Sequence, residues 1–143
     1  MRYRFRVEDA ISRYRAASEA ADAEALAGTL APDVQLLSPI SGRAVFRGSE
    51  DVQLLLGEVY RSLSGLRWFE QIGDGSRRVV LGHARIGVFN MDDAMVFDLD
   101  AEGRIARITP HMRPWLGLTA LAVALLPRVG RHPALMLRAL RRP

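Results

Sequence analysis

The sequence contains no cysteine and no lysine, and it has only three histidines among 143 residues. The absence of cysteine excludes disulfide bonds, a thiolate nucleophile and cysteine-ligated metal sites. No segment reaches the roughly 18 consecutive apolar residues that a membrane-spanning helix needs. The opening segment MRYRFRVEDA is basic but lacks the apolar stretch of a signal peptide, so we expect a cytoplasmic protein.

All 20 basic residues are arginines, and their distribution matters more than the formal net charge of +4. Eight of them lie in the two terminal segments: Arg2, Arg4, Arg6, Arg128, Arg131, Arg138, Arg141 and Arg142. The chain between these segments carries twelve arginines and sixteen acidic residues, which is a net charge of about −4. Nucleic-acid-binding domains present a basic patch or stripe on their body, so we expect no nucleic-acid partner.

A chain of this length is expected to form one domain, and about half of its residues are apolar. The spacing of apolar residues predicts an amphipathic helix over 8–21 and a short second helix over 23–30, with Asp22 as its N-cap. A third helix is predicted with Ser49 as its N-cap, acidic residues in its first turn and an end at Gly65. Its apolar stripe is Val52, Leu55, Leu56, Val59 and Leu63.

Strand-like segments surround and follow the third helix. VQLL at 34–37 predicts a short strand that ends at Ser38-Pro39 and leads into a loop. Four further strands are predicted from LRWFEQI, RRVVLGHARIGVF, AMVFDLD and RIARITPHM, joined by turns at 73–75, 90–93 and 101–103. Helices followed by a meander of antiparallel strands predict an α+β fold.

Side chains alternate between the two faces of a strand, which sorts the polar residues of the predicted sheet. One apolar row should face the helices, because helices must bury their apolar stripe against the sheet. If the polar rows of neighbouring strands align, the helix-free face carries this cluster: His83, Arg85, Asp98, Thr109 and His111. The helix-side row then contains the small residues Gly82 and Ala84, which leave space.

The segment AADAEALAGTLAPDVQLLSPISGRAVFRGSEDVQLLL, residues 20–56, resembles the signature of the nuclear transport factor 2-like superfamily. This superfamily includes SnoaL-like polyketide cyclases, ketosteroid isomerase, limonene-epoxide hydrolase and scytalone dehydratase. The resemblance covers residues 8–113, and the ending MRPWLGLTAL is similar to uncharacterised SnoaL-like bacterial proteins. It implies a cystatin-like cone, in which helices close over a curved antiparallel sheet around a pocket. The cone is expected to span 1–114, with 115–143 as a helical tail of the same domain.

The resemblance to ketosteroid isomerases implies roles for two positions. Tyr14 has the sequence context of the tyrosine on the first helix of those enzymes, and Ser38-Pro39 stands where they have a catalytic Asp-Pro. A serine hydroxyl has no accessible pKa near neutrality, so Ser38 cannot shuttle a proton as that carboxylate does. The second acid of that family falls near Met95 in this chain and is absent too.

Limonene-epoxide hydrolases use an Asp-Arg-Asp set, and the corresponding strands of this chain lack the second aspartate. Neither enzyme mechanism therefore carries over as a whole. The acid–base residues that remain are Tyr14, His83 and Asp98, which we predict as the catalytic set if the two strand residues face the pocket. In the alternative interpretation, His83, Arg85, Asp98 and His111 are solvated or interface residues on the outer face of the sheet.

The individual ligand-binding candidates also have two interpretations. Tyr14 is either a hydrogen-bond donor in the pocket or a helix residue with a wet hydroxyl. Ser38 either contacts a ligand oxygen or serves only the turn before Pro39. We predict ligand contacts for Tyr14, Ser38, Trp68, Arg85, Phe97, His111 and Met112. Three of these fit a hydrophobic core equally well: Trp68, Phe97 and Met112. No metal site and no cofactor are expected.

The tail, 115–143, predicts two helices broken at Pro127 and Pro133. Its apolar segment WLGLTALAVALL has twelve residues, too few to span a bilayer. Three roles fit the tail: a lid over the mouth of the cone, a contact with a dimer partner, or a helix that lies on a membrane surface or binds a partner. The third role uses arginines that share a face opposite the apolar side chains: Arg138, Arg141 and Arg142 against Met136, Leu137 and Leu140.

These features predict a protein that acts on a small, largely apolar molecule as an isomerase, cyclase, dehydratase or epoxide hydrolase. A non-catalytic module that binds a hydrophobic ligand is the first alternative, because the acids of the related enzymes are missing. A dimeric interaction module, whose tail engages a membrane or a protein, is the second. We expect a homodimer that forms through the outer face of the sheet.

Overall fold

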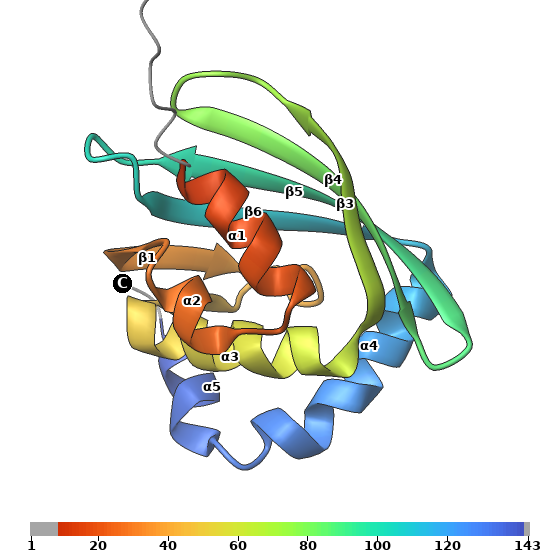
Figure 1. Cartoon of the computed structure of the whole chain (residues 1–143). Helices are drawn as coiled ribbons and strands as arrows, with labels where there is room; N and C mark the ends of the chain where they lie inside the picture. The colour runs from red at the N-terminus through yellow and green to blue at the C-terminus, as the bar shows by residue number, and fades with distance from the viewer. Residues whose placement is uncertain (1–8, 142–143) are drawn as a thin grey trace, which may run out of the picture.

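The computed structural model describes residues 9–141, in which helices cover one side of a curved six-stranded sheet (Figure 1). In chain order the elements are α1 Ala10–Glu19, α2 Ala23–Ala27, β1 Leu30–Leu37, β2 Val45–Arg47, α3 Ser49–Ser62, β3 Ser64–Ile72, β4 Arg77–Ile86, β5 Phe89–Leu99, β6 Ile105–Arg113, α4 Trp115–Val129 and α5 Pro133–Leu140. The predicted α+β class is confirmed. Some residues of the predicted elements and tails lie outside the described part of the chain: Arg2, Arg4, Arg6, Glu8 and Arg142.

Two aspartates cap the N-terminal helices, as expected for helix starts. Asp9 accepts a hydrogen bond from the backbone N–H of Ser12 at 2.9 Å, and Asp22 accepts one from that of Ala25 at 3.0 Å. The second helix is shorter than predicted, because the chain enters β1 at Leu30 and pairs there with β6. Pro32 is tolerated within β1 because the pairing with β6 is irregular between Leu30 and Gln35.

The strand order of the sheet is β2-β1-β6-β5-β4-β3. Strands β3 to β6 form the predicted antiparallel meander. In contrast, β1 pairs with β6 in parallel, which the prediction of a purely antiparallel sheet missed. The predicted loop before the third helix also contains a strand, since Val45–Arg47 returns along β1 with Phe46 opposite Leu36.

The predicted turn at 90–93 is wrong, and this error matters for the site. The chain reverses at Gly87, whose φ of 56° is a left-handed conformation that glycine adopts readily. Residues 90–93 lie within β5 and pair with β4, where Asn90 stands opposite Arg85 and Asp93 opposite Gly82. Asp93 is therefore a strand residue whose side chain points to the helix-covered face.

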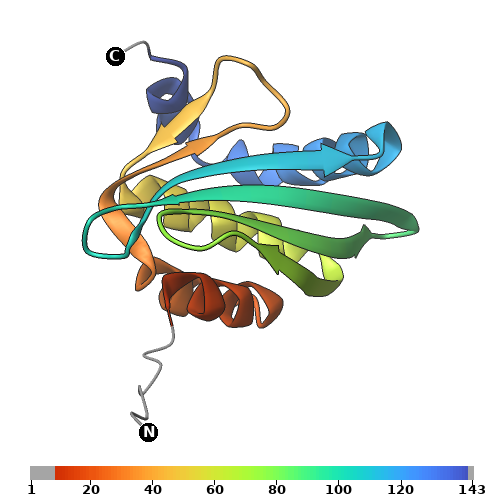
Figure 2. The same cartoon turned by 90° about the horizontal axis from the view of Figure 1, so that it is seen from above.

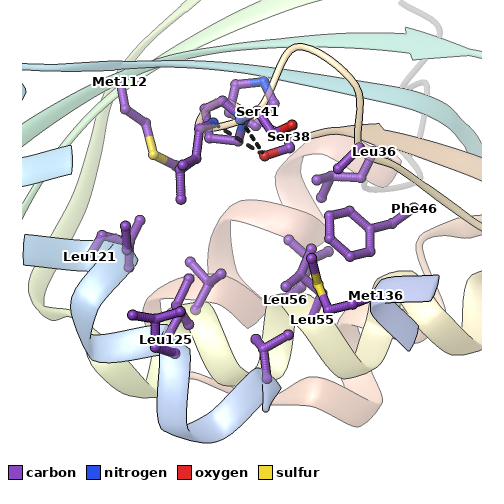
Figure 3. Close-up of a pocket in the computed structure, with 18 of the residues that line it drawn as sticks. Leu36, Ser38, Ser41, Phe46, Leu55, Leu56, Met112, Leu121, Leu125 and Met136 are labelled. Atoms are coloured by element: carbon purple, nitrogen blue, oxygen red, sulfur yellow. Dashed lines mark hydrogen bonds between the residues drawn. The ribbon is translucent and has the colours of Figure 1, made fainter. Parts of the chain in front are cut away.

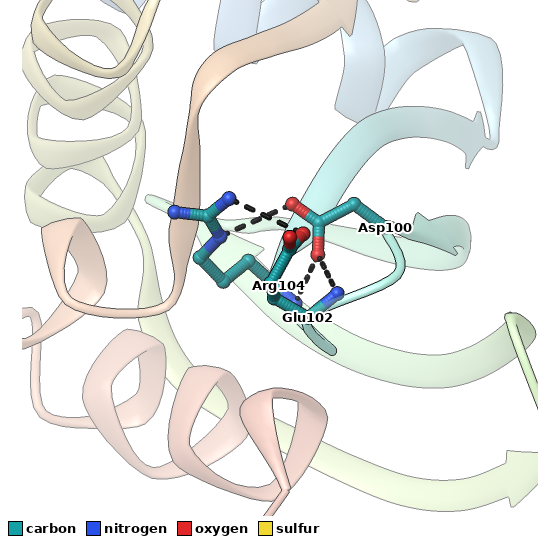
Figure 4. A network of polar contacts seen from close by, with 3 residues as sticks. All are labelled: Asp100, Glu102 and Arg104. Atoms are coloured by element: carbon teal, nitrogen blue, oxygen red, sulfur yellow. Dashed lines mark hydrogen bonds and ion pairs between the residues drawn. The ribbon is translucent and has the colours of Figure 1, made fainter.

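The predicted turn at 101–103 is confirmed, and one carboxylate organises it (Figure 4). Asp100 Oδ1 accepts hydrogen bonds from the backbone N–H groups of Glu102 and Arg104 at 3.0 and 2.9 Å. The Arg104 guanidinium donates to the other oxygen of Asp100 at 3.1 Å. Gly103, with φ of 78°, completes the reversal from β5 to β6.

The core lies between the helices and the inner face of the sheet, with α3 and α4 behind the sheet in Figure 2. The predicted apolar stripe of the third helix is buried there at Val52, Leu55 and Leu56. The N-cap of this helix is Gly48, so the prediction of Ser49 as N-cap is wrong by one residue. The space predicted at Gly82 is filled, because a Cβ built on this glycine would lie 2.4 Å from the ring of Trp68. The glycine thus allows Trp68 to lie flat on β4 and leaves no ligand space there.

The two tail helices pack against α3 and the sheet. The first continues through Pro127, where a break was predicted, and the second begins at Pro133, a favourable first position of a helix. Arg128 lies 3.6 Å from Glu58, and Arg138 donates two hydrogen bonds to Asp51 at 2.8 and 2.9 Å. No helix within residues 9–141 is both long enough and apolar enough to cross a bilayer.

Gly117→Ala is expected to lower the free energy of unfolding by about 1–3 kcal/mol, because α4 touches β5 at this glycine. A Cβ at Gly117 would lie 2.4 Å from the carbonyl oxygen of Asn90, and that backbone atom belongs to a paired strand. Urea unfolding measures the effect, and Gly42→Ala, which meets nothing within 4 Å, is the matched control. Equal stability of the two variants would contradict the tight contact between α4 and β5.

Candidate functional site

A cavity of about 350 Å³ lies between α3, the tail helices, the inner face of the sheet and the loop that follows β1 (Figure 3). Its lining is almost entirely aliphatic, aromatic or thioether, including Leu36, Phe46, Leu55, Leu121, Leu125 and Met136. Among the lining residues in the described part of the chain, none is charged and three carry hydroxyl groups: Ser38, Ser41 and Tyr60. This cavity has the size and polarity of a site for a small hydrophobic molecule.

Ser38 lines this cavity, but its side chain also organises the loop. Its Oγ accepts hydrogen bonds from the backbone N–H groups of Ile40 and Ser41 at 3.2 and 3.1 Å, as Figure 3 shows. Because Oγ is the acceptor in both bonds, the hydroxyl proton of Ser38 remains free to be donated to another group. The turn interpretation of Ser38 is therefore confirmed, and its contact with a ligand oxygen stays a prediction.

Tyr14 is fully buried and lies behind the cavity, so its predicted place in the lining and the alternative of a wet hydroxyl are both wrong. Its hydroxyl is hydrogen-bonded to the Tyr60 hydroxyl at 2.5 Å, and its ring packs edge-on against Phe97 at a centroid distance of 4.9 Å. Tyr60 lines the cavity. Tyr14 thus reaches the cavity through Tyr60.

Burial raises the pKa of both tyrosine hydroxyls. For Tyr60, the neighbouring Tyr14 and the charge of Asp93 act in the same direction, whereas the hydrogen bond with Tyr60 opposes the rise of the pKa of Tyr14. Both hydroxyls therefore stay protonated at neutral pH. One of their two protons makes the hydrogen bond between them, and the other can be donated to a third oxygen.

Sequence reasoning missed Tyr60 and also an acid on β5, Asp93. Its side chain is buried on the inner face of β5, and desolvation raises its pKa to about 7, against the opposing effect of a 3.3 Å hydrogen bond from the backbone N–H of His111. Met95, where the sequence comparison sought a second acid, lies two residues further along the same face. The signal was present in the sequence, because counting strand parity from Met95 places Asp93 on the inner row.

Asp93 lines a second, much smaller cavity beside the first, of about 10 Å³. That volume is enough for roughly one water molecule and too small for a ligand. The two cavities share Val59, Tyr60 and Met112 as lining residues. Tyr60 therefore stands between the apolar cavity on one side and the buried carboxyl group on the other.

The predicted catalytic set of Tyr14, His83 and Asp98 is not assembled. The alternation of burial along β4 and β5 places His83 and Asp98 on the outer face of the sheet. His83 Nδ1 lies 2.9 Å from Asp92 Oδ1, and Asp98 lies 3.5 Å from Arg77. The physical reason is strand parity: the inner row at these positions is occupied by Gly82, Ala84, Met95 and Phe97.

Two other polar candidates also lie on the outer face, where they cannot line the cavity. Arg85 is exposed, and so is His111, whose Nδ1 lies 3.2 Å from the carbonyl oxygen of Ala94. Across this face, strand pairing aligns a charged row: Arg67, His83, Asp92 and Arg113. The outer-face interpretation of these polar residues is confirmed, whereas the homodimer through this face stays a prediction.

The remaining candidates divide between core and cavity wall. Phe97 is completely buried and Trp68 nearly so, with the indole N–H of Trp68 donating to Ser18 at 2.8 Å. Neither lines the larger cavity, so both belong to the core in this structure. Met112 lines both cavities. Within residues 9–141, no three histidine, aspartate or glutamate side chains gather as metal ligands.

No protein-family model and no curated protein matches the chain. Among solved structures, an uncharacterised bacterial protein with a cystatin-like fold from Silicibacter pomeroyi has a TM-score of 0.85 and 23% identity, over 91% of this chain and 93% of that one. A steroid delta-isomerase from Pseudomonas aeruginosa has a TM-score of 0.79 and 24% identity, over 87% and 92%. A protein with a ketosteroid isomerase-like fold from Catenulispora acidiphila, solved with trimethylamine, has a TM-score of 0.63 and 13% identity, over 81% and 93%. At these identities the likeness concerns the fold.

Proposed function

We propose that this chain, which has the nuclear transport factor 2-like, cystatin-like fold, binds a small, largely apolar molecule that carries an oxygen atom. One observation supports this most strongly: Tyr60 joins an apolar cavity of about 350 Å³ to a buried pair of hydroxyls and a buried carboxyl group. The proposal concerns the site, because a shared fold does not transfer an activity.

The apolar lining sets the class of ligand. A charged molecule would lose its hydration in this cavity, and the lining residues in the described chain offer it no ion-pair partner. An apolar molecule instead gains about 25 cal/mol for each Å² of its surface that is removed from water. A fused-ring or branched hydrocarbon skeleton therefore fits the cavity better than a polar metabolite.

The hydroxyl groups define the polar end of the ligand. When Tyr14 donates the hydrogen bond within the pair, the Tyr60 proton is left for a ligand oxygen, and a protonated Asp93 provides a further donor close by. A carbonyl, phenol or ether oxygen accepts such a bond, and its polarisation is the usual first step of isomerisation or cyclisation next to a carbonyl. This arrangement supports a ligand with one oxygen directed toward Tyr60.

Proton transfer is a second candidate function, and the environment of Asp93 favours it. A carboxyl group with a pKa of about 7 can both accept and release a proton at neutral pH. An isomerase or cyclase reaction would then rely on Asp93, since Ser38 cannot serve as a base. We do not extend the proposal to epoxide hydrolysis, because no carboxylate or arginine lines the larger cavity among the described residues.

Tyr60→Phe is expected to weaken binding of 2-naphthol about 3- to 10-fold while leaving binding of naphthalene unchanged, because the two probes differ by one hydroxyl group. The wild type should prefer 2-naphthol, and ligand fluorescence measures both affinities. Ser41→Ala, which removes a different lining hydroxyl, is the control and should keep the preference. If the wild type binds neither probe, or binds both equally, the proposed function is wrong.

A further inference from the structure

The tail helix α4 presents an uncharged, mostly apolar face to solvent. Trp115 is 75% exposed, Val123 61% and Leu126 70%, and Leu116 is also exposed. Leu116, Val123 and Leu126 are separated by seven and three residues, and Trp115 adjoins Leu116, so all four lie on one side of the helix. The buried positions Gly117, Leu121 and Leu125 lie on the opposite side. A helix that had only to cover the core would carry polar residues on this side.

This exposed face continues around the opening of the cavity. Leu126 lines the cavity, and so do Ile40 from the loop after β1 and Leu140 from α5. The side chains of both Ile40 and Leu140 are about half exposed. We call the set of Ile40, Trp115, Leu116, Val123, Leu126 and Leu140 the mouth surface. Three of its six members thus belong to the cavity and to the outer surface at once.

The described tail that forms most of the mouth surface carries basic residues and no acidic ones. No acidic residue follows Glu102 in the chain, whereas the described tail, 115–141, carries four arginines: Arg128, Arg131, Arg138 and Arg141. Two of these arginines are paired with acids on α3, Arg138 with Asp51 and Arg128 with Glu58. The positive charge that remains lies on Arg131 and Arg141, which form no ion pair within residues 9–141. A surface of apolar side chains bordered by arginines is complementary to an anionic lipid surface.

The dimensions of α4 suit a helix that lies along a membrane. Its 15 residues span about 22 Å, which is shorter than the hydrocarbon core of a bilayer. Trp115 stands at its first position, and tryptophan favours the boundary between lipid headgroups and acyl chains. These features support contact in the plane of the surface.

We propose that the mouth surface docks on the surface of an anionic lipid bilayer, so that the cavity opens toward the lipid. An apolar ligand can then pass between bilayer and cavity without crossing water, which would otherwise oppose its transfer. The docking itself depends only on the mouth surface and its arginines. The ligand exchange rests on the proposed function of the cavity.

Vesicle sedimentation tests the docking. The wild type should bind vesicles of phosphatidylcholine with about a quarter of phosphatidylglycerol, and binding should weaken at high salt and with phosphatidylcholine alone. The variant Trp115→Ala/Leu116→Ser/Val123→Ser, which leaves the cavity lining intact, should reduce the partition coefficient at least about tenfold. The control Phe69→Ser/Val88→Ser removes exposed apolar side chains elsewhere and should bind as the wild type does.

Intrinsic fluorescence gives a second readout. The two tryptophans differ sharply, since Trp68 is 5% exposed and Trp115 75%. Emission should shift to shorter wavelength when vesicles are added, and Trp115→Phe should abolish the shift while sedimentation with vesicles is largely retained. A shift that instead appears with rising protein concentration in the absence of lipid would overturn the proposal in favour of contact with a second copy.

The outcomes for docking and for the cavity are separable. If the triple variant loses vesicle binding but keeps its preference for 2-naphthol over naphthalene, both proposals are supported. If the wild type does not bind anionic vesicles, or the control variant loses as much binding as the triple variant, the docking is wrong, whatever the naphthol result. Loss of the naphthol preference with vesicle binding intact counts against the proposed function alone.

Discussion

The free energy of unfolding of Asp93→Asn, relative to that of the wild type, is expected to increase by up to about 4 kcal/mol as the pH is raised from about 4 to about 7. Burial raises the pKa of Asp93 to about 7 from an ordinary value of 3.8. The unfolded chain therefore releases this proton near pH 4, whereas the folded protein keeps it until about pH 7. In that interval the folded state binds more protons, so the contribution of Asp93 to stability falls as the pH rises. Asparagine does not titrate and removes this loss.

Urea unfolding of both proteins over this pH range measures the effect as the difference between them. Subtracting the free energy of unfolding of the wild type from that of the variant removes the contribution of the other titrating carboxyl groups. Any loss of stability from the altered hydrogen bond with His111 is the same at every pH and does not change the slope. The control is Asp92→Asn, since Asp92 lies on the opposite face with its side chain 46% exposed. Its surface ion pairs should change stability by about 1 kcal/mol or less. A pH-independent difference for Asp93→Asn would show that this carboxyl group is ionised in the fold.

Phe97→Ala is expected to lower the free energy of unfolding by about 3–5 kcal/mol, the range for removal of a buried aromatic side chain. Phe97 is completely buried near the end of β5, and its ring packs edge-on against the ring of Tyr14. Tyr14 should consequently lose its fixed position, and the preference for 2-naphthol should decrease as well.

The neighbouring residue provides the control for Phe97. Val96 is half-buried on the outer face of the same strand, so Val96→Ala should reduce stability by about 1 kcal/mol or less. Unfolding in urea distinguishes the two variants, because the expected difference exceeds the uncertainty of the extrapolation. Similar losses for Phe97→Ala and Val96→Ala would contradict the assignment of the two faces of β5.

The alternation of residues along the later strands correctly indicated an outer-face cluster of polar side chains, although the same residues were also predicted as catalytic or ligand-binding. His83, Arg85, Asp98 and His111 fall on the outer face because parity along a paired strand leaves only two choices, and the apolar row must cover the core. The order of helices and strands was predictable for a similar reason. Both depend on patterns among residues close together in the chain.

The inner-face position of Asp93 was missed because its segment has the composition of a turn. The segment NMDD has the composition of a turn, whereas the chain actually reverses at Gly87, three residues earlier. Pairing of β4 with β5 and β6 holds residues 90–93 in the sheet, and such pairing involves contacts that local composition does not encode. Because the turn was predicted at the wrong place, Asp93 was not recognised as a buried acid. His83 and Asp98 were predicted as catalytic residues instead.

Local residue patterns therefore account for the fold class, the alternation of the sheet faces and the turn role of Ser38, because each depends on backbone preferences and on neighbours in the chain. The cavity, the Tyr14–Tyr60 pair and the raised pKa of Asp93 arise only when distant segments meet. Residues 46 positions apart form the hydroxyl pair, and the tail completes the cavity wall from the other end of the chain. The physical reason is that burial and desolvation are produced by the surrounding structure, whereas an aspartate in the sequence looks the same in a turn and in a core.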